Sequence, residues 1–166
     1  MVFSTTYLLP LVWSLAASDG THRSFFLSGV ATLAVGTLLW GATRRYRREL
    51  QVRDGVLLVV LGWAAMAGVA TVPLMLEIPG LSFTDAFFET MSGLTTTGAT
   101  VLVGLDQLPQ ALNLWRHALN WYGGMGIIVL VVAILPLLGV GGMQLYKAET
   151  PGPVKNEKLT PRITET

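Results

Sequence analysis

The chain has 166 residues, of which 52% are hydrophobic and only 13% charged, with a formal net charge of +1. So little polar surface cannot cover a water-soluble domain, which means that part of the surrounding solvent is lipid, and the near-neutral charge gives no indication of nucleic-acid binding. The absence of cysteine and the presence of only two histidines, His22 and His117, exclude disulfide scaffolds, cysteine nucleophiles and thiolate or histidine zinc clusters.

Four stretches without Asp, Glu, Lys or Arg divide the chain. They comprise residues 1–18, 24–43, 55–76 and 117–146. A hydrocarbon core of ~30 Å needs about 20 helical residues, so the sequence predicts four membrane-spanning helices, the first of marginal length. The first stretch lacks the basic start of a secretory signal and contains Pro10 and Trp13, which favours a membrane helix.

Positive charge is distributed unevenly along the chain. Of the 11 Lys and Arg residues, all but Arg23 and Arg116 lie between the second and third stretches or after the fourth. Because short loops rich in Lys and Arg remain in the cytoplasm, the sequence predicts cytoplasmic N- and C-termini. The outer segments carry more acidic than basic residues, which mildly favours the approach of cations; a chance scatter of solvated acids explains the same excess equally well.

The segment between the third and fourth stretches is too short for an outer domain and too apolar for an ordinary loop. Ser82 and Asp85 have the spacing of a helix-capping box. Apolar residues then recur at helical intervals, at Phe83, Phe87, Met91 and Leu94. The sequence therefore predicts a helix over about 83–94. At ~18 Å this helix is shorter than the bilayer core, so it enters the membrane and stops midway.

Residues 95–100 read Thr-Thr-Thr-Gly-Ala-Thr, a composition that favours extended backbone over helix. Extended backbone at membrane depth leaves its carbonyl groups unsatisfied unless protein surrounds them or water and ions occupy the site. Carbonyl oxygens that replace the hydration shell of a cation solve this problem, and Gly98 permits the torsion angles that aim successive oxygens the same way. The predicted fold is an all-α integral membrane protein with four spans, one re-entrant short helix and an extended filter.

Several motifs carry a resemblance to a known family. They are DAFFETMSGLTTTGATV at 85–101, LDQLP at 105–109, WYGGMGIIVLVVAILPLLGVGGMQLYKAE at 121–149 and PGPVK at 151–155. Within the first, TTGAT resembles the TVGYG filter of potassium channels, although only its first Thr and its Gly match. The chain as a whole resembles the Trk/Ktr/HKT superfamily of potassium transporters, and most closely the TrkH/TrkG membrane subunits of bacteria.

In that family one polypeptide carries four tandem units of helix, pore loop and helix after a leading helix pair. The resemblance implies a leading transmembrane pair at 1–43, a basic cytoplasmic loop at 44–55, a first unit at 56–142 and a cytoplasmic tail at 143–166. Within the first unit, the pore helix is expected at about 83–94 and the filter at 95–100. Because one loop supplies only one side of a fourfold ring, we expect this chain to be a fragment or a truncated product.

The resemblance implies potassium uptake across the bacterial inner membrane, with potassium as the substrate, no cofactor and no enzymatic activity. Backbone oxygens of Thr96, Thr97, Gly98 and Ala99 are expected to bind the ion. The family also implies a homodimer and a cytosolic ring of TrkA-type regulators with nucleotide-binding folds, which would face the basic loop and the tail. The alternative function is a nonconducting membrane assembly or regulatory protein whose re-entrant loop is structural packing.

Single residues of this region allow competing interpretations. Glu89 lies within the short helix, where support of the filter backbone is favoured over direct ion contact. For Arg116 and His117, at the start of the fourth stretch, anchoring at the membrane interface is favoured over repulsion of cations. Gly123, Gly124 and Gly126 are predicted to allow close helix packing rather than to form a hinge, and Pro136 to bend its helix without a gating task.

Overall fold

The computed structural model describes residues 1–45, 52–130 and 132, and every regular element in these residues is helical. The elements are η1 (Val2–Tyr7), α1 (Leu8–Ala17), α2 (His22–Thr43), α3 (Val52–Glu77), α4 (Phe83–Leu94), η2 (Leu105–Gln107) and α5 (Gln110–Val129). Pro136, residues 46–51 of the basic loop and the 143–166 tail lie outside the described residues, so the predictions made for them remain predictions.

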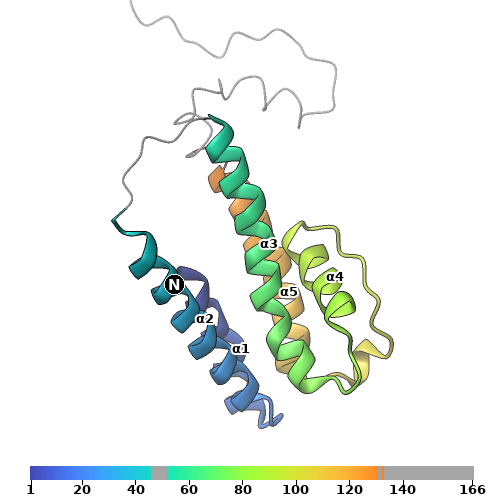
Figure 1. Ribbon diagram of the computed structural model, residues 1–166. Helices are drawn as coiled ribbons and strands as arrows, with labels where there is room; N and C mark the ends of the chain where they lie inside the picture. The colour runs from blue at the N-terminus through green and yellow to red at the C-terminus, as the bar shows by residue number, and fades with distance from the viewer. Residues whose placement is uncertain (46–51, 131, 133–166) are drawn as a thin grey trace, which may run out of the picture.

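The helices form two groups on either side of a central pair. Figure 1 shows α1 and α2 side by side on one flank of α3 and α5, and the shorter α4 with its following loop on the other flank. The central pair therefore contacts both the leading hairpin and the 83–103 region.

Two helices are long and apolar enough to cross a membrane, judged by length and composition within the described residues. These are His22–Thr43 and Asp54–Glu77, and Val2–Ala17 forms a shorter apolar helix. The prediction of four spans therefore remains open for the first and fourth stretches.

Helix α5 extends beyond the fourth charge-free stretch. It begins at Gln110, seven residues before that stretch, and includes Arg116. The charge of Arg116 is compatible with this position because its guanidinium pairs with the carboxylate of Glu89.

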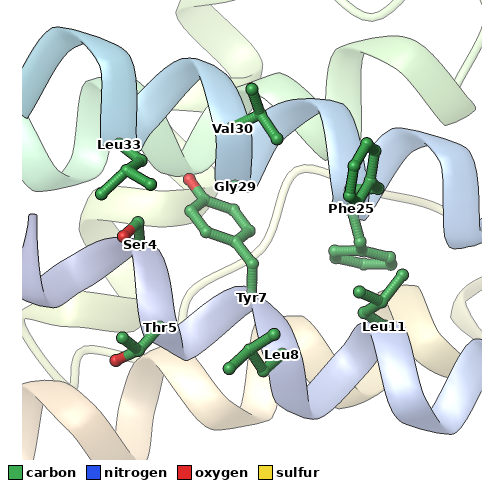
Figure 2. Close-up of a pocket in the computed structure, with 10 residues that line it drawn as sticks. Ser4, Thr5, Tyr7, Leu8, Leu11, Phe25, Gly29, Val30 and Leu33 are labelled. Atoms are coloured by element: carbon green, nitrogen blue, oxygen red, sulfur yellow. The ribbon is translucent and has the colours of Figure 1, made fainter.

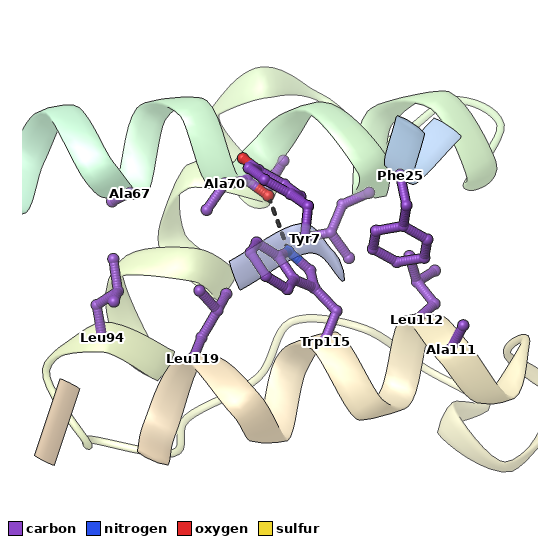
Figure 3. Close-up of a cluster of buried hydrophobic side chains, with 11 residues drawn as sticks. Tyr7, Phe25, Ala67, Ala70, Leu94, Ala111, Leu112, Trp115 and Leu119 are labelled. Carbon is purple, nitrogen blue, oxygen red and sulfur yellow. Dashed lines mark hydrogen bonds between the residues drawn. The ribbon is translucent and has the colours of Figure 1, made fainter. Parts of the chain in front are cut away.

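The core joins the leading hairpin to the central pair around a fully buried Trp115. Its indole ring stacks on Tyr7 with the centroids 4.6 Å apart and lies 6.1 Å from the ring of Phe25 (Figure 3). The Trp115 Nε1 donates to the carbonyl of Ala70 at 3.2 Å, and the Tyr7 hydroxyl donates to Val69 O at 2.8 Å. The Tyr7 hydroxyl and the Trp115 indole nitrogen thus both bond to the backbone of α3. The stacked rings of these two residues therefore hold η1, α3 and α5 together.

Tyr7 also fixes the leading hairpin itself. Its ring packs against α2 beside Gly29 (Figure 2), and a Cβ atom on that glycine would lie 3.6 Å from the Tyr7 Cβ. A cavity of about 260 Å³ remains between η1, α1 and α2, with apolar side chains such as Leu8 and Val30 in its lining. No charged side chain lines this small, mostly apolar cavity.

Candidate functional site

Helix α4 has a well-defined beginning. The Ser82 Oγ accepts a hydrogen bond from the Asp85 amide at 3.1 Å and donates to the Asp85 carboxylate at 2.7 Å, as the capping-box spacing predicts. The helix covers Phe83–Leu94, the same residues as the short helix expected from the sequence. On its inner face the Thr90 hydroxyl donates to Ala67 O at 2.9 Å, which fixes α4 to α3.

The backbone leaves the helix sharply after Leu94. The amides of Thr97 and Gly98 both donate back to Ser92 O, at 2.9 and 3.3 Å. Thr96 and Gly98 have positive φ angles of 57° and 74°. A left-handed torsion is ordinary for glycine but strained for a β-branched threonine, and such strain occurs mostly at functional sites.

The carbonyl groups of this segment differ in their partners. The oxygens of Thr96, Thr97 and Gly98 accept no hydrogen bond from any residue that the structure describes, and these residues are exposed. The oxygen of Ala99 accepts from the Ser92 hydroxyl at 2.7 Å. Three consecutive peptide oxygens are therefore available to an outside ligand, whereas the fourth is tied to α4.

A buried carboxylate holds the far end of the segment. The Glu89 side chain is only 2% exposed, and its Oε2 accepts from the Val101 amide at 3.1 Å. Its Oε1 accepts from the Thr100 hydroxyl at 2.8 Å and from Arg116 Nε and Nη2 at 2.8 and 2.5 Å. Glu89 therefore bonds to the loop from the side of α4.

Arg116 does not have the position expected from the sequence. Its side chain is 14% exposed and points at Glu89, with Nη2 also 3.2 Å from the Thr100 hydroxyl. The expectation of interfacial anchoring is wrong for Arg116, because a buried acid one helix away is a better partner than lipid headgroups. His117 is exposed and borders a polar cavity of about 300 Å³, together with Asn120 and Gly98.

Small residues of α5 receive the C-terminal end of α4. A Cβ atom on Gly123 would collide with the Leu94 carbonyl, and one on Gly126 would lie 3.1 Å from the ring of Trp63. Trp63 Nε1 donates to the same Leu94 oxygen at 3.3 Å. Close packing against the pore helix is confirmed at Gly123, whereas Gly126 packs on Trp63 of α3. Trp63 was not predicted as part of this site, since nothing near it in sequence indicates a partner in α4.

A second polar cluster, around the half-buried Asp19, lies at the start of α5 and was not predicted from the sequence. Asp19, between α1 and α2, accepts from the Ala111 amide at 2.9 Å through Oδ2. Its Oδ1 accepts from the Thr21 amide and hydroxyl at 3.1 and 2.8 Å and from the Ser14 hydroxyl. Desolvation by burial acts to raise the pKa of Asp19, but these hydrogen bonds outweigh it and lower the pKa below its usual value.

No group of three or more His, Asp or Glu side chains that could hold a metal ion occurs among the residues that the structure describes.

Comparisons with known proteins agree on one family. The sequence profile of TrkH, described as a cation transport protein, matches residues 21–166. The chain is 54% identical over its full length to the Trk system potassium uptake protein TrkH of Salmonella typhimurium and 53% identical to that of Escherichia coli K12. It is 41% identical over 99% of its length to the Trk system potassium uptake protein TrkG of Escherichia coli K12. The matched regions cover 35%, 35% and 34% of these relatives, so the chain spans about a third of their length.

Proposed function

The chain belongs to the TrkH family of cation transport proteins, and from this premise we propose that it supplies one filter loop for potassium uptake across a bacterial inner membrane. Family members are transport proteins rather than enzymes, which agrees with the expectation drawn from the sequence.

The observation that carries the proposal is the row of free oxygens at Thr96, Thr97 and Gly98. Peptide oxygens without a partner are costly at membrane depth unless a ligand occupies them, and a dehydrated monovalent cation is the ligand that carbonyl oxygens suit. Ala99 has a different role in the proposal, because its oxygen already accepts from Ser92. We propose that the carbonyl group of Ala99 holds the loop against α4 through this bond.

In the proposed architecture, α3, α4 with its loop, and α5 form the helix, pore loop and helix of one unit. The leading hairpin precedes them, both termini are cytoplasmic, and the total is four spans. One loop provides one side of a fourfold oxygen field, so three further loops complete the filter in the working transporter. The homodimer and the nucleotide-binding regulatory ring at the basic loop and tail belong to the proposal through the family resemblance alone.

A chimaera tests this function without requiring the chain to act by itself. In it, these 166 residues replace the aligned part of the Escherichia coli relative, which is 53% identical. We expect the chimaera to restore growth at low external potassium in cells that lack their own uptake systems. The alternative function, a nonconducting assembly, predicts that a chimaera present in the membrane in normal amount restores nothing.

A matched pair of glycine variants tests the filter assignment within that chimaera. A Cβ atom on either Gly98 or Gly68 would meet no atom within 4 Å, but only Gly98 has a positive φ. Gly98→Val should therefore abolish selective potassium uptake by turning the peptide oxygens away, whereas Gly68→Val in α3 should leave it near the parent level. Selective uptake by both variants would refute the assignment.

A further inference from the structure

The first two turns of α5 are held by residues from the other end of the chain. The residue that precedes α5, Pro109, provides no side-chain cap, so the first amides of the helix need an acceptor from elsewhere. Asp19 supplies it through the 2.9 Å bond from the Ala111 amide to Oδ2. The other oxygen of this carboxylate accepts hydrogen bonds from Thr21 and Ser14, both of which are buried. A residue of the leading hairpin therefore caps a helix 92 positions away.

One turn further along, the same hairpin determines the rotation of α5. Trp115 is fully buried between Tyr7 and Phe25 (Figure 3), and Ala111 is fully buried beside them. A large ring enclosed in this way permits little rotation or translation of the helix that carries it. The capping bond and the ring stack therefore fix both the height and the rotation of this part of α5.

The next residue transmits this position to the loop. Successive helical residues are about 100° apart, so Arg116 points away from the hairpin and toward α4. There it bonds to Glu89 and Thr100, and Glu89 in turn accepts the amide of Val101. A continuous series of hydrogen bonds and packed rings thus runs from Asp19 to the end of the segment with the free oxygens.

We propose that Asp19 is a positioning residue for the filter loop, acting through the start of α5 and the Arg116–Glu89 pair. It does not contact the ion. This inference rests on the proposed function for its role in selectivity, while the mechanical coupling from Asp19 to Val101 stands on the contacts alone.

Hydrogen exchange of the intact 166-residue chain in lipid nanodiscs tests the coupling directly. In Asp19→Ala the Ala111 amide loses its acceptor, and its exchange should accelerate about 2- to 30-fold, which corresponds to the ~0.5–2 kcal/mol that a lost helix cap costs. If Asp19 positions the loop, the Val101 amide should also exchange about twofold faster or more. Acceleration confined to Ala111 and its neighbours would show a purely local cap and overturn the proposal.

Two further variants control this experiment. Asp106→Asn removes an exposed acid on the short η2 helix, close to the start of α5 in sequence, and should change neither amide. Asp19→Asn keeps one oxygen of similar position, so it should accelerate both amides by less than Asp19→Ala. An equal effect of Asp106→Asn would mean that loss of outer negative charge, rather than loss of the cap, is responsible, and this too would overturn the proposal.

Transport separates a failure of this inference from a failure of the proposed function. In the chimaera, Asp19→Ala should lower the preference for potassium over sodium severalfold at an unchanged amount of protein in the membrane, and Asp106→Asn should leave the preference as it was. A parent chimaera that carries potassium together with an unaltered preference in Asp19→Ala would refute the positioning role alone. A parent chimaera that carries no potassium would refute the proposed function, and the selectivity role with it.

Discussion

Helix α3 and the 83–103 segment lie side by side but satisfy their backbone groups in different ways. In α3 most peptide groups bond within the helix, and apolar side chains such as Leu57 and Leu61 are exposed on its surface. Tyr7 and Trp115 add hydrogen bonds to two of its carbonyl groups. In the 83–103 segment, side chains from three helices supply the partners that the interrupted backbone lacks. A continuous helix thus satisfies its backbone mainly by itself, whereas an interrupted segment depends on side-chain partners or on a ligand.

In the 83–103 segment, some backbone groups have a side-chain partner and others do not. The Leu94 oxygen has Trp63, the Ala99 oxygen has Ser92 and the Val101 amide has Glu89. Between them lie the oxygens of residues 96–98, without partners among the described residues. Together with the positive φ angles of Thr96 and Gly98, these exposed oxygens fit a ligand that takes the place of the missing donors.

The largest expected effect comes from breaking the buried ion pair. Glu89→Gln leaves the guanidinium of Arg116, which is only 14% exposed, without its counter-charge and should lower the free energy of unfolding by about 3–5 kcal/mol. Denaturant unfolding in detergent measures it. The double variant Glu89→Gln with Arg116→Gln removes both charges and should recover part of the loss; a double variant no more stable than the single would contradict the pairing.

The next effect concerns the contact between α4 and α5. Gly123→Ala places a methyl group against the Leu94 carbonyl and should cost about 1–3 kcal/mol of stability through overpacking. Gly124→Ala is the matched control, because its Cβ would lie at an ordinary 3.8 Å from Thr96 Cγ2. Thermal unfolding of the two variants compares them. Equal melting temperatures would show that the close approach of Gly123 to the Leu94 carbonyl does not affect stability.

These sites show what sequence alone can and cannot provide. Local signals were sufficient for α4, because Ser82 and Asp85 lie three residues apart and form the cap that their spacing predicts. The bonds from Asp19 to Ala111 and from Trp63 to Leu94 join residues 92 and 31 positions apart. No periodicity or spacing encodes such pairs, so they become visible only when the helices are packed.

The same limit explains the error at Arg116. A charge at the edge of an apolar stretch normally marks the membrane surface, which is why interfacial anchoring was expected for it. Its partner Glu89 lies 27 positions earlier, and the sequence gives no indication that the two meet. The composition of residues 95–100 predicts extended backbone, and the family resemblance implies ion binding by the oxygens of residues 96–99, but the distinct role of Ala99 depends on the Ser92 bond.

A smaller effect is expected from the indole that bonds to the end of α4. Trp63→Phe keeps most of the apolar ring but removes the donor to the Leu94 oxygen, which should cost about 1 kcal/mol. Trp13→Phe provides the control, because Trp13 is 48% exposed. Chemical unfolding of both variants checks the difference. A loss at Trp13 as large as that at Trp63 would indicate a general effect of indole rather than this bond.

The smallest effect is a pH dependence through Asp19. Because its pKa is lowered on folding, its stabilising contribution is complete above the unfolded value of 3.8 and is lost as the pH falls through the lower folded value. The stability difference between the parent and Asp19→Asn should therefore be constant from about pH 7 to pH 5 and shrink only below about pH 4. A difference that disappeared near neutrality would contradict the hydrogen bonding at this carboxylate.

Isotope-edited infrared spectroscopy of the chimaera tests the central assignment most directly, with carbon-13 placed in the carbonyl of Gly98 in one sample and of Ala99 in another. Our account predicts that the Gly98 carbonyl band shifts when potassium replaces sodium, because its oxygen meets the ion, and that the Ala99 band shifts much less. A Gly98 band that is the same in both salts, or that has the frequency of a continuous helix, would contradict the account.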